Sequence, residues 1–225
     1  MRSINCRLRL SIALHMDLSS NILSITIASP LQSSVQDAMT LSAKYGAQIA
    51  SKTILVTGVS PTSIGSAFVN ALAASSPSLL ILAGRNASKL SQTSASIAEA
   101  HPTVRVRTLQ VDLSSLESVR RSVEELLSWN DVPAIDVLVN NAGVMATGYA
   151  LSQEGIESQF VANHLGHFLF TNLIMPKLLT AEAPRVVAVA SDGHRLSPIR
   201  WDDLNFDVSQ PLIMSLFPSG PIIAF

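Results

Sequence analysis

The sequence has a single cysteine, Cys6, among 225 residues, so no disulfide can form within the chain. This usage suits a reducing compartment, where thiols stay free. Charged residues make up only 14% of the chain, and the formal net charge is −1. Lysine and arginine form no stripe, which excludes the usual electrostatic footprint of a nucleic-acid-binding protein. We therefore expect no nucleic acid as a partner.

No apolar stretch of the N-terminal region reaches the roughly 18 residues that a membrane-spanning helix needs. Residues 10–14 are apolar and follow several arginines, but Ser11 interrupts them. Residues 1–35 stay open to two interpretations: a mitochondrial or secretory leader, or a disordered extension upstream of a later start such as Met39. We expect a cytoplasmic protein without a transmembrane span, with targeting by this segment as the alternative.

Short apolar runs alternate regularly with segments of helical periodicity over residues 36–207. The runs predict strands at Thr53–Val56, Leu79–Leu82, Val104–Val111, Asp136–Val139 and Arg185–Ala190. The segments between them predict helices at Gly65–Ala74 and Ser88–Ala100, a third helix that is capped by Ser114 or Ser115 and runs to Trp129, and a fourth at Gln153–Leu179 that Pro176 kinks or shortens. Such alternation predicts an α/β domain: a Rossmann-type, doubly wound parallel sheet of about five strands.

The first predicted strand ends at Gly58, crosses a polar turn, and meets Gly65 at the start of a helix. Backbone N–H groups at a helix start, together with the helix dipole, favour a phosphate-bearing ligand. The residues that we expect to bind a cofactor here are Gly58, Ser60, Ser63, Ile64 and Gly65. Glycines also serve ordinary strand–helix turns, so the prediction depends on the residues at the ends of the other strands.

Arg85 comes after the second predicted strand, at the place where an acidic residue would select NAD(H) and an arginine accommodates the 2′-phosphate of NADP(H). Lys89 could assist it, and the alternative is a solvated surface arginine. Asp112 and Leu113 come after the third strand. Asp112 could receive an adenine amino group, or it could simply cap the next helix.

Asn140-Asn141-Ala142-Gly143 comes after the fourth strand and puts small and amide side chains where the chain must pass close to a flat ring. His164 and His167 are spaced for a metal site but lack a clear third ligand, so we expect no metal. His194 lies three residues after Ser191. Nucleophilic catalysis is disfavoured because the surrounding residues lack the first glycine of a Gly-x-Ser-x-Gly turn.

In combination, these motifs resemble the short-chain dehydrogenase/reductase family, particularly fungal members related to retinol-dehydrogenase-like enzymes. The resemblance covers residues 37–207 and is carried by Thr57-Gly58, Ile64-Gly65, Arg85, Asp112-Leu113, Asn140-Asn141-Ala142-Gly143, Asn163-His164-Leu165-Gly166-His167-Phe168 and Val187-Ala188-Val189-Ala190-Ser191. It implies NADP(H) as the cofactor and a small-molecule carbonyl or alcohol as the substrate.

The resemblance also implies roles for single residues. Asp112 and Asn140 would contact the adenosine side of the cofactor, and Ala142 and Gly143 belong to the same cofactor-binding loop. Asn163 matches the family's catalytic asparagine, whose helix position binds a relay water. Ser191 matches the serine that hydrogen-bonds the substrate oxygen.

Two departures from the family pattern affect this interpretation. The middle glycine of the turn should fall near Ser63, where a side chain either crowds the phosphates or occupies a strained backbone position. The family's Tyr-x-x-x-Lys motif is missing: both tyrosines, Tyr45 and Tyr149, precede Ser191, and the last lysine is Lys177. We therefore expect little or no activity from the chain as written.

Residues 208–225 match nothing in the family and are interpreted as a divergent tail, either a truncated end or the end of a shortened paralogue. The fifth strand is expected to be an exposed edge that invites self-association. Three hypotheses about function remain: an oxidoreductase scaffold, a non-catalytic nucleotide-binding or partner-binding module, and a non-functional truncated product.

Overall fold

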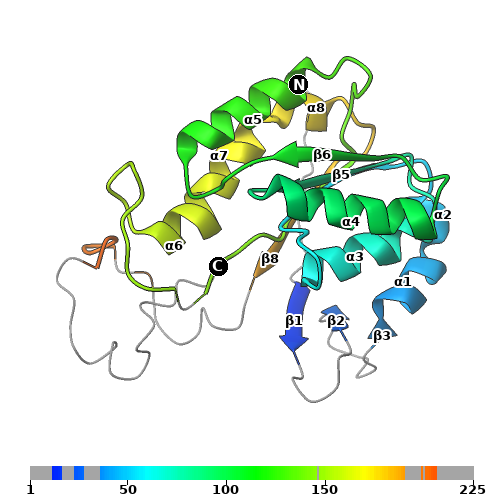
Figure 1. Cartoon of the computed structure of the whole chain (residues 1–225), viewed down its shortest axis with the longest axis horizontal. Helices are drawn as coiled ribbons and strands as arrows, with labels where there is room; N and C mark the ends of the chain where they lie inside the picture. Colours follow the sequence, from blue (N-terminus) through cyan, green and yellow to red (C-terminus); the bar gives the residue numbers. More distant parts are fainter. Residues whose placement is uncertain are drawn as a thin grey trace, which may run out of the picture.

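The centre of the computed structural model is one sheet, and the residues that the structure describes are 12–16, 23–27, 36–145, 147–190, 199 and 201–206. The strands lie in the order β3-β2-β1-β8-β7-β4-β5-β6. Figure 1 shows the neighbouring strands β5 and β6 side by side. They span Ile12–Met16 (β1), Leu23–Ile27 (β2), Gln36–Asp37 (β3), Thr53–Thr57 (β4), Leu79–Gly84 (β5), Val106–Gln110 (β6), Val137–Asn140 (β7) and Arg185–Ala190 (β8).

The strands β8, β7, β4, β5 and β6 form a parallel sheet. β4 pairs with β5 on one side and with β7 on the other, and β6 and β8 lie outside them. Leu55, Val56 and Ile81 have no exposed surface, as expected for parallel strands that are covered on both faces. The predicted α/β fold with five parallel strands is confirmed.

Helices flank this sheet, and the three longest helices in the described residues, α3, α4 and α5, begin at a capping side chain. They span Ala38–Lys44 (α1), Gly46–Ile49 (α2), Ile64–Ala73 (α3), Ala87–Ala100 (α4), Leu116–Ser128 (α5), Ser158–Phe160 (α6), Gly166–Leu173 (α7) and Met175–Leu179 (α8). Ser63, Asn86 and Ser115 accept the N–H three residues on, as N-caps do. In the part of the chain that the structure describes, no helix is long and apolar enough to cross a membrane.

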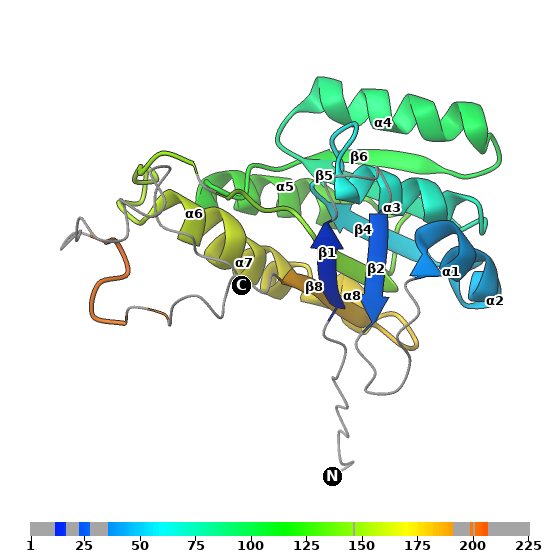
Figure 2. The same ribbon diagram turned by 90° about the horizontal axis from the view of Figure 1, so that it is seen from below.

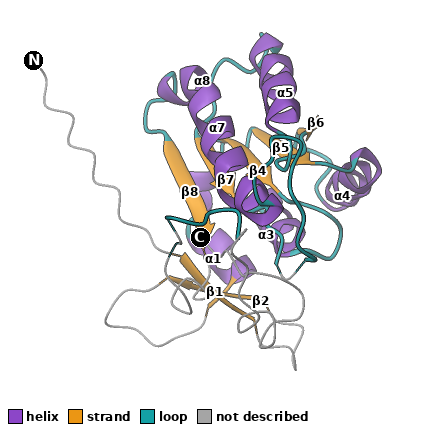
Figure 3. Cartoon of the chain, turned by 90° about the vertical axis from the view of Figure 1, so that its left-hand side faces the viewer, coloured by secondary structure: helices purple, strands orange, loops and turns teal. Residues whose placement is uncertain are grey.

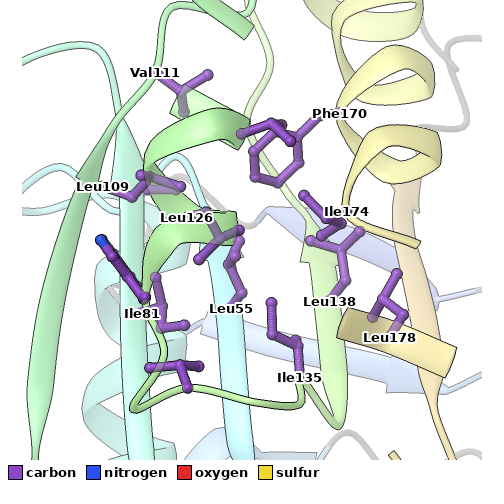
Figure 4. Close-up of a cluster of buried hydrophobic side chains, with 14 of the residues drawn as sticks. Leu55, Ile81, Leu109, Val111, Leu126, Ile135, Leu138, Phe170, Ile174 and Leu178 are labelled. Carbon is purple, nitrogen blue, oxygen red and sulfur yellow. The ribbon is translucent and has the colours of Figure 1, made fainter. Parts of the chain in front are cut away.

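The two faces of the sheet are covered by different helices, with α3 and α4 on one face and α5 and α7 on the other (Figure 3). Alternation along a strand sorts the side chains: Leu80 and Leu82 join the cluster under α3 and α4, whereas Ile81 joins the opposite cluster. Figure 4 shows that second cluster, in which Phe170 and Ile174 meet the sheet. The sheet is therefore packed on both faces and supports the loops at its ends.

The long helix predicted over residues 153–179 is divided into shorter elements. It begins at Ser158 because the Glu157 carboxylate accepts the N–H groups of Gln159 and Phe160. A π-helical turn, η1 (Val161–Leu165), separates α6 from α7. Pro176 lies in the first turn of α8, where its missing N–H is tolerated. The prediction was right about Pro176 but wrong about one continuous helix.

The strands β1 and β2 come from the segment that was interpreted as a leader or extension. They pair antiparallel with each other and lie side by side in Figure 2. β1 also pairs in parallel with β8, at Val189 and Ala190. The expectation that β8 is an open edge is therefore wrong at its carboxyl end. The sequence signal that was missed is the apolar–polar alternation of Leu23–Ile27, which is typical of a strand.

Candidate functional site

A cavity of about 580 Å³ opens at the carboxyl ends of β4, β5, β6 and β7. Ten of the residues predicted to bind a cofactor line it: Gly58, Ser60, Ser63, Ile64, Gly65, Arg85, Asp112, Leu113, Ala142 and Gly143. Two others, Lys89 and Asn140, are not part of its wall. Lys89 is exposed on α4, and the Asn140 amide donates a 3.0 Å hydrogen bond to Thr171 on α7. Ser191 lies outside the described residues.

The glycine turn after β4 packs directly against the loop after β7. Gly58 has φ +74°, and a Cβ atom there would lie 2.6 Å from the Cα of Ala142. A Cβ on Gly65 would lie 2.4 Å from the Gly58 carbonyl oxygen and 2.6 Å from Asn141 Nδ2. Both positions need glycine because backbone or a fixed amide occupies the space of a side chain. The start of α3 is thereby brought against the cavity.

Thr57, the last residue of β4, ties the two loops together. Its buried hydroxyl oxygen accepts the N–H groups of Asn141, at 3.0 Å, and Ala142, at 2.9 Å. In return, Asn141 Nδ2 donates to the carbonyl oxygens of Thr57 and Gly58. Asn141 therefore holds the loop after β7 against the glycine turn after β4. The sequence motif contained Asn141, but only Asn140 was predicted to act in the site.

The backbone strain expected near Ser63 is found one residue earlier. Thr62 has φ +61°, a region that β-branched residues rarely adopt. Ser63 has φ −87°, and its hydroxyl accepts the Ser66 N–H and donates to the Gly58 carbonyl. Ser63 is thus a helix cap that takes the Ser66 N–H. The N–H groups of Ile64 and Gly65, which have no partners within the helix, are available to a ligand.

We expect the variant Thr62→Gly to be more stable than the wild type, because it removes the strain at a positive φ. The gain should be about 1 kcal/mol, after the extra backbone entropy of glycine is subtracted. Thermal unfolding should show a rise in Tm of about 2–4 °C. Thr103→Gly is the control, because Thr103 is also exposed in a turn but has no positive φ. An equal rise in both variants would contradict this account.

Arg85 and Asp112 line the cavity after β5 and β6. The Arg85 side chain is exposed, while its carbonyl accepts a hydrogen bond from Gln110. One carboxylate oxygen of Asp112 accepts both the N–H and the hydroxyl of Ser114, at 3.0 and 2.6 Å. The cap of α5 is Ser115. Asp112 therefore holds the turn before α5 and does not cap the helix itself.

Asn163 lies in the π-helical turn and faces the same loop as Thr57. Its Oδ1 accepts the Val144 N–H at 2.8 Å, and its Nδ2 donates to the Val144 carbonyl at 2.9 Å. Val144 lines the cavity. The extra residue of a π-turn is a common feature of functional sites. Here both polar atoms of the Asn163 amide are occupied in holding the cavity wall.

His167 is the other polar residue under this wall. Its Nε2 lies 3.1 Å from the Thr57 hydroxyl, and its Nδ1 lies 3.2 Å from the Asn163 carbonyl oxygen. Burial lowers the pKa of His167; the hydrogen bond with the Asn163 backbone opposes this, and the nearby His164 adds to it. The imidazole is therefore neutral near pH 7.

Neither tyrosine lies where a proton donor would be needed. Tyr149 is nearly half exposed, and its hydroxyl donates to the Asn205 carbonyl at 2.9 Å. Tyr45 lies between α1 and α2, beneath the Lys44 ammonium. Several small wall residues, Thr147, Gly148, Ala150 and Ala162, were not predicted from the sequence. Nothing distinguishes them in the sequence from an ordinary loop and helix.

A parallel sheet with its cavity at the carboxyl ends, walled by a glycine turn and a helix start, defines a Rossmann-type protein. The family model described as short chain dehydrogenase matches residues 52–201. The chain belongs to the short-chain dehydrogenase/reductase family, whose members use a nicotinamide cofactor. The family predicted from the sequence is confirmed.

Individual relatives agree with this assignment. Oxidoreductase fscI of Fusarium equiseti is 32% identical over 187 residues, which cover 81% of this chain and 72% of that protein. Retinol dehydrogenase 13 of Homo sapiens is 36% identical over 160 residues, 71% of this chain and 47% of that protein. A solved protein from Mycobacterium paratuberculosis is 36% identical, with a TM-score of 0.58, over 72% of this chain and 54% of that one. The chain thus spans about half the length of the last two.

Proposed function

We propose that this chain binds NADP(H) in the cavity, as the nucleotide-binding part of an oxidoreductase that acts on a carbonyl or alcohol. The observation that carries the proposal is the position of two features on one cavity wall. The first turn of α3 supplies N–H groups for a pyrophosphate, and Arg85, which lines the same cavity after β5, supplies a cation for the 2′-phosphate. A carboxylate at the place of Arg85 would favour NAD(H) instead.

The cavity wall favours a flat, extended ligand. Ala142 and Gly143 present little side chain beside the glycine turn, and hydrogen bonds from Thr57 and Asn141 hold them in place. One carboxylate oxygen of Asp112 accepts hydrogen bonds from Ser114, and the second oxygen is a candidate acceptor for the adenine amino group. These residues bind and orient the ligand, and the bound nicotinamide ring is what gives or takes the hydride.

The residues proposed for chemistry are Asn163 and Ser191, on the basis of the family resemblance. Asn163 acts through its backbone, because its side-chain amide is bonded to Val144. Ser191 is proposed to orient the substrate oxygen. No Tyr-x-x-x-Lys occurs in the 225 residues, so the proton transfer lacks its usual donor. A missing general acid lowers the rate by about 10²–10⁴-fold. We therefore propose that these 225 residues bind the cofactor but turn over very slowly.

The test is a titration of the purified chain with NADPH and NADH, followed by nucleotide fluorescence. We expect tighter binding of NADPH, and a loss of about 10–100-fold in NADPH affinity in Arg85→Ala, because a charged hydrogen bond to the 2′-phosphate is removed. NADH affinity should hardly change. Lys89→Ala is the matched control, since Lys89 is a nearby exposed cation outside the cavity wall.

The outcomes separate the remaining hypotheses about function. NADPH binding without oxidation of NADPH by aldehydes or ketones supports the proposal and also fits a non-catalytic nucleotide-binding module. Rapid NADPH oxidation would contradict the proposed slow turnover. Equal effects of Arg85→Ala on NADPH and NADH would contradict the proposed 2′-phosphate contact. A chain that shows neither binding nor a cooperative melt would be a non-functional truncated product.

A further inference from the structure

Two separate clamps hold the segment 141–144 that forms one wall of the cavity. At its start, the Thr57 hydroxyl accepts the N–H groups of Asn141 and Ala142. At its end, the Asn163 side chain bonds to both the N–H and the carbonyl of Val144. The clamps belong to different elements, the end of β4 and the π-helical turn. His167 on α7 is buried between them and contacts both.

The proton of the Thr57 hydroxyl decides how His167 is bonded. A hydroxyl oxygen has two acceptor sites and one proton to donate. The N–H groups of Asn141 and Ala142 occupy both acceptor sites. The proton can go to His167 Nε2 at 3.1 Å or to the Val139 carbonyl at 3.4 Å, and the second distance is longer than a normal O–H···O bond. Thr57 therefore donates to His167.

The tautomer of His167 is a consequence of that donation. Because Nε2 accepts, it carries no proton, and a neutral imidazole then has its one proton on Nδ1. Nδ1 lies 3.2 Å from the Asn163 carbonyl oxygen and donates to it. A protonated ring would place a third N–H against the Thr57 oxygen, which has no acceptor site left. The buried position of the ring, 7% exposed, also favours the neutral form.

We propose that His167, as its neutral Nδ1–H tautomer, is a positioning residue that joins the Thr57 clamp to the Asn163 clamp. This assignment rests on the nucleotide-binding function proposed above, because the wall that His167 positions is the one proposed to bind the nucleotide. The ring bonds to the end of β4 on one side and to the π-helical turn on the other, and so fixes the two relative to each other. The distance of Ala142 and Gly143 from the start of α3 is thereby kept constant. Loss of the link leaves each clamp intact but lets the wall between them move.

The first test reads the tautomer directly and needs no nucleotide. Long-range ¹⁵N–¹H NMR of the histidine rings, with His167→Gln used to assign the signals, should show a proton on Nδ1 of His167 at pH 7. A proton on Nε2, or on both nitrogens, would overturn the proposal.

The second test uses substitutions that keep one contact each. His167→Gln places an amide near the position of Nε2, His167→Asn places one near Nδ1, and His167→Leu keeps neither. We expect NADPH affinity to fall about tenfold in His167→Leu, and by less in the two amide variants. In combination with Thr57→Val, His167→Leu should cost less than it does alone, because the two residues share one hydrogen bond. Fully additive losses would overturn the link.

Hydrogen exchange separates positioning from general stability. In His167→Leu, the amides of Asn141, Ala142 and Val144 should exchange faster than in the wild type, while the exchange of the amides in the sheet changes little. Phe170→Leu is the control, because Phe170 is a fully buried core residue on the same helix. If Phe170→Leu accelerates the same amides equally at equal global stability, the assignment is wrong. If the wild type shows the Nδ1–H tautomer but binds no NADPH, the proposed function fails while the link stands.

Discussion

The variant Gly65→Ala is expected to bind NADPH about 100-fold more weakly than the wild type, a loss of about 2.7 kcal/mol. The new methyl group would lie 2.4 Å from the Gly58 carbonyl oxygen and 2.6 Å from Asn141 Nδ2. Neither group can turn away, because Gly58 is backbone and Asn141 Nδ2 is held by the carbonyls of Thr57 and Gly58. The start of α3 must therefore move away from the wall on which we propose that the nucleotide binds.

Fluorescence titration with NADPH measures this effect, and Gly148→Ala is the control. Gly148 also lines the cavity, but no atom lies within 4 Å of a Cβ placed there. Its substitution should leave the affinity within about twofold, as expected where no contact is disturbed. An equal loss in both variants would show that any methyl group on the wall is harmful, and that packing between the two loops is not the cause.

The second large effect concerns stability. Gly166→Ala should lower the free energy of unfolding by about 2–3 kcal/mol, even though alanine favours helices. A Cβ at Gly166 would lie 2.2 Å from the Leu113 carbonyl oxygen and 3.0 Å from the Leu113 Cβ. Gly166 thus lets α7 approach the backbone of the turn after β6 closely. With one methyl group in that space, either α7 or the turn at Leu113 must shift.

Thermal unfolding should show a fall in Tm of about 5–10 °C for Gly166→Ala. Gly46→Ala is the control, because Gly46 is also helical and a Cβ there meets only Ser75, at 3.5 Å. That variant should be as stable as the wild type or slightly more stable, since it gains helix propensity without a clash. A similar fall in Tm for both variants would rule out the contact between α7 and Leu113 as the cause.

Much of the fold could be predicted because local pattern and tertiary structure agree in the centre of the chain. The run Leu79–Leu82 is apolar throughout, and its strand is buried on both faces. The boundaries predicted for β8 are those observed, Arg185–Ala190. The start of α5 could be predicted to within one residue, because Ser114 or Ser115 was expected to cap it and Ser115 does so. These signals depend on neighbours in the sequence, so one sequence is enough to recognise them.

The features that were missed depend on contacts between distant residues. The pairing of β1 with β8 joins residues far apart in the chain, and the sequence of β1 gives no partner. The strain in the turn was placed near Ser63 but falls on Thr62, because the side chain of Ser63 is used to cap α3. The π-helical turn at Asn163 has no sequence pattern of its own. The positions of the five parallel strands could be predicted, but the three strands before them and the conformations of the turns could not.

The Thr57 hydroxyl also has a consequence for how the protein is made. Its acceptor sites are filled by the N–H groups of Asn141 and Ala142, the latter 85 residues later in the chain. A ribosome that adds about 5–20 residues per second needs about 4–17 s to cover that distance. Late in this interval, once Gln110 has been added, β4, β5 and β6 have all been synthesised and can pair. The Thr57 hydroxyl, which is buried in the finished protein, then still has only water as a hydrogen-bond partner. Until β7 has been synthesised, the edge of β4 with which β7 will pair is exposed in the nascent sheet. This is the period in which a chaperone has most to protect.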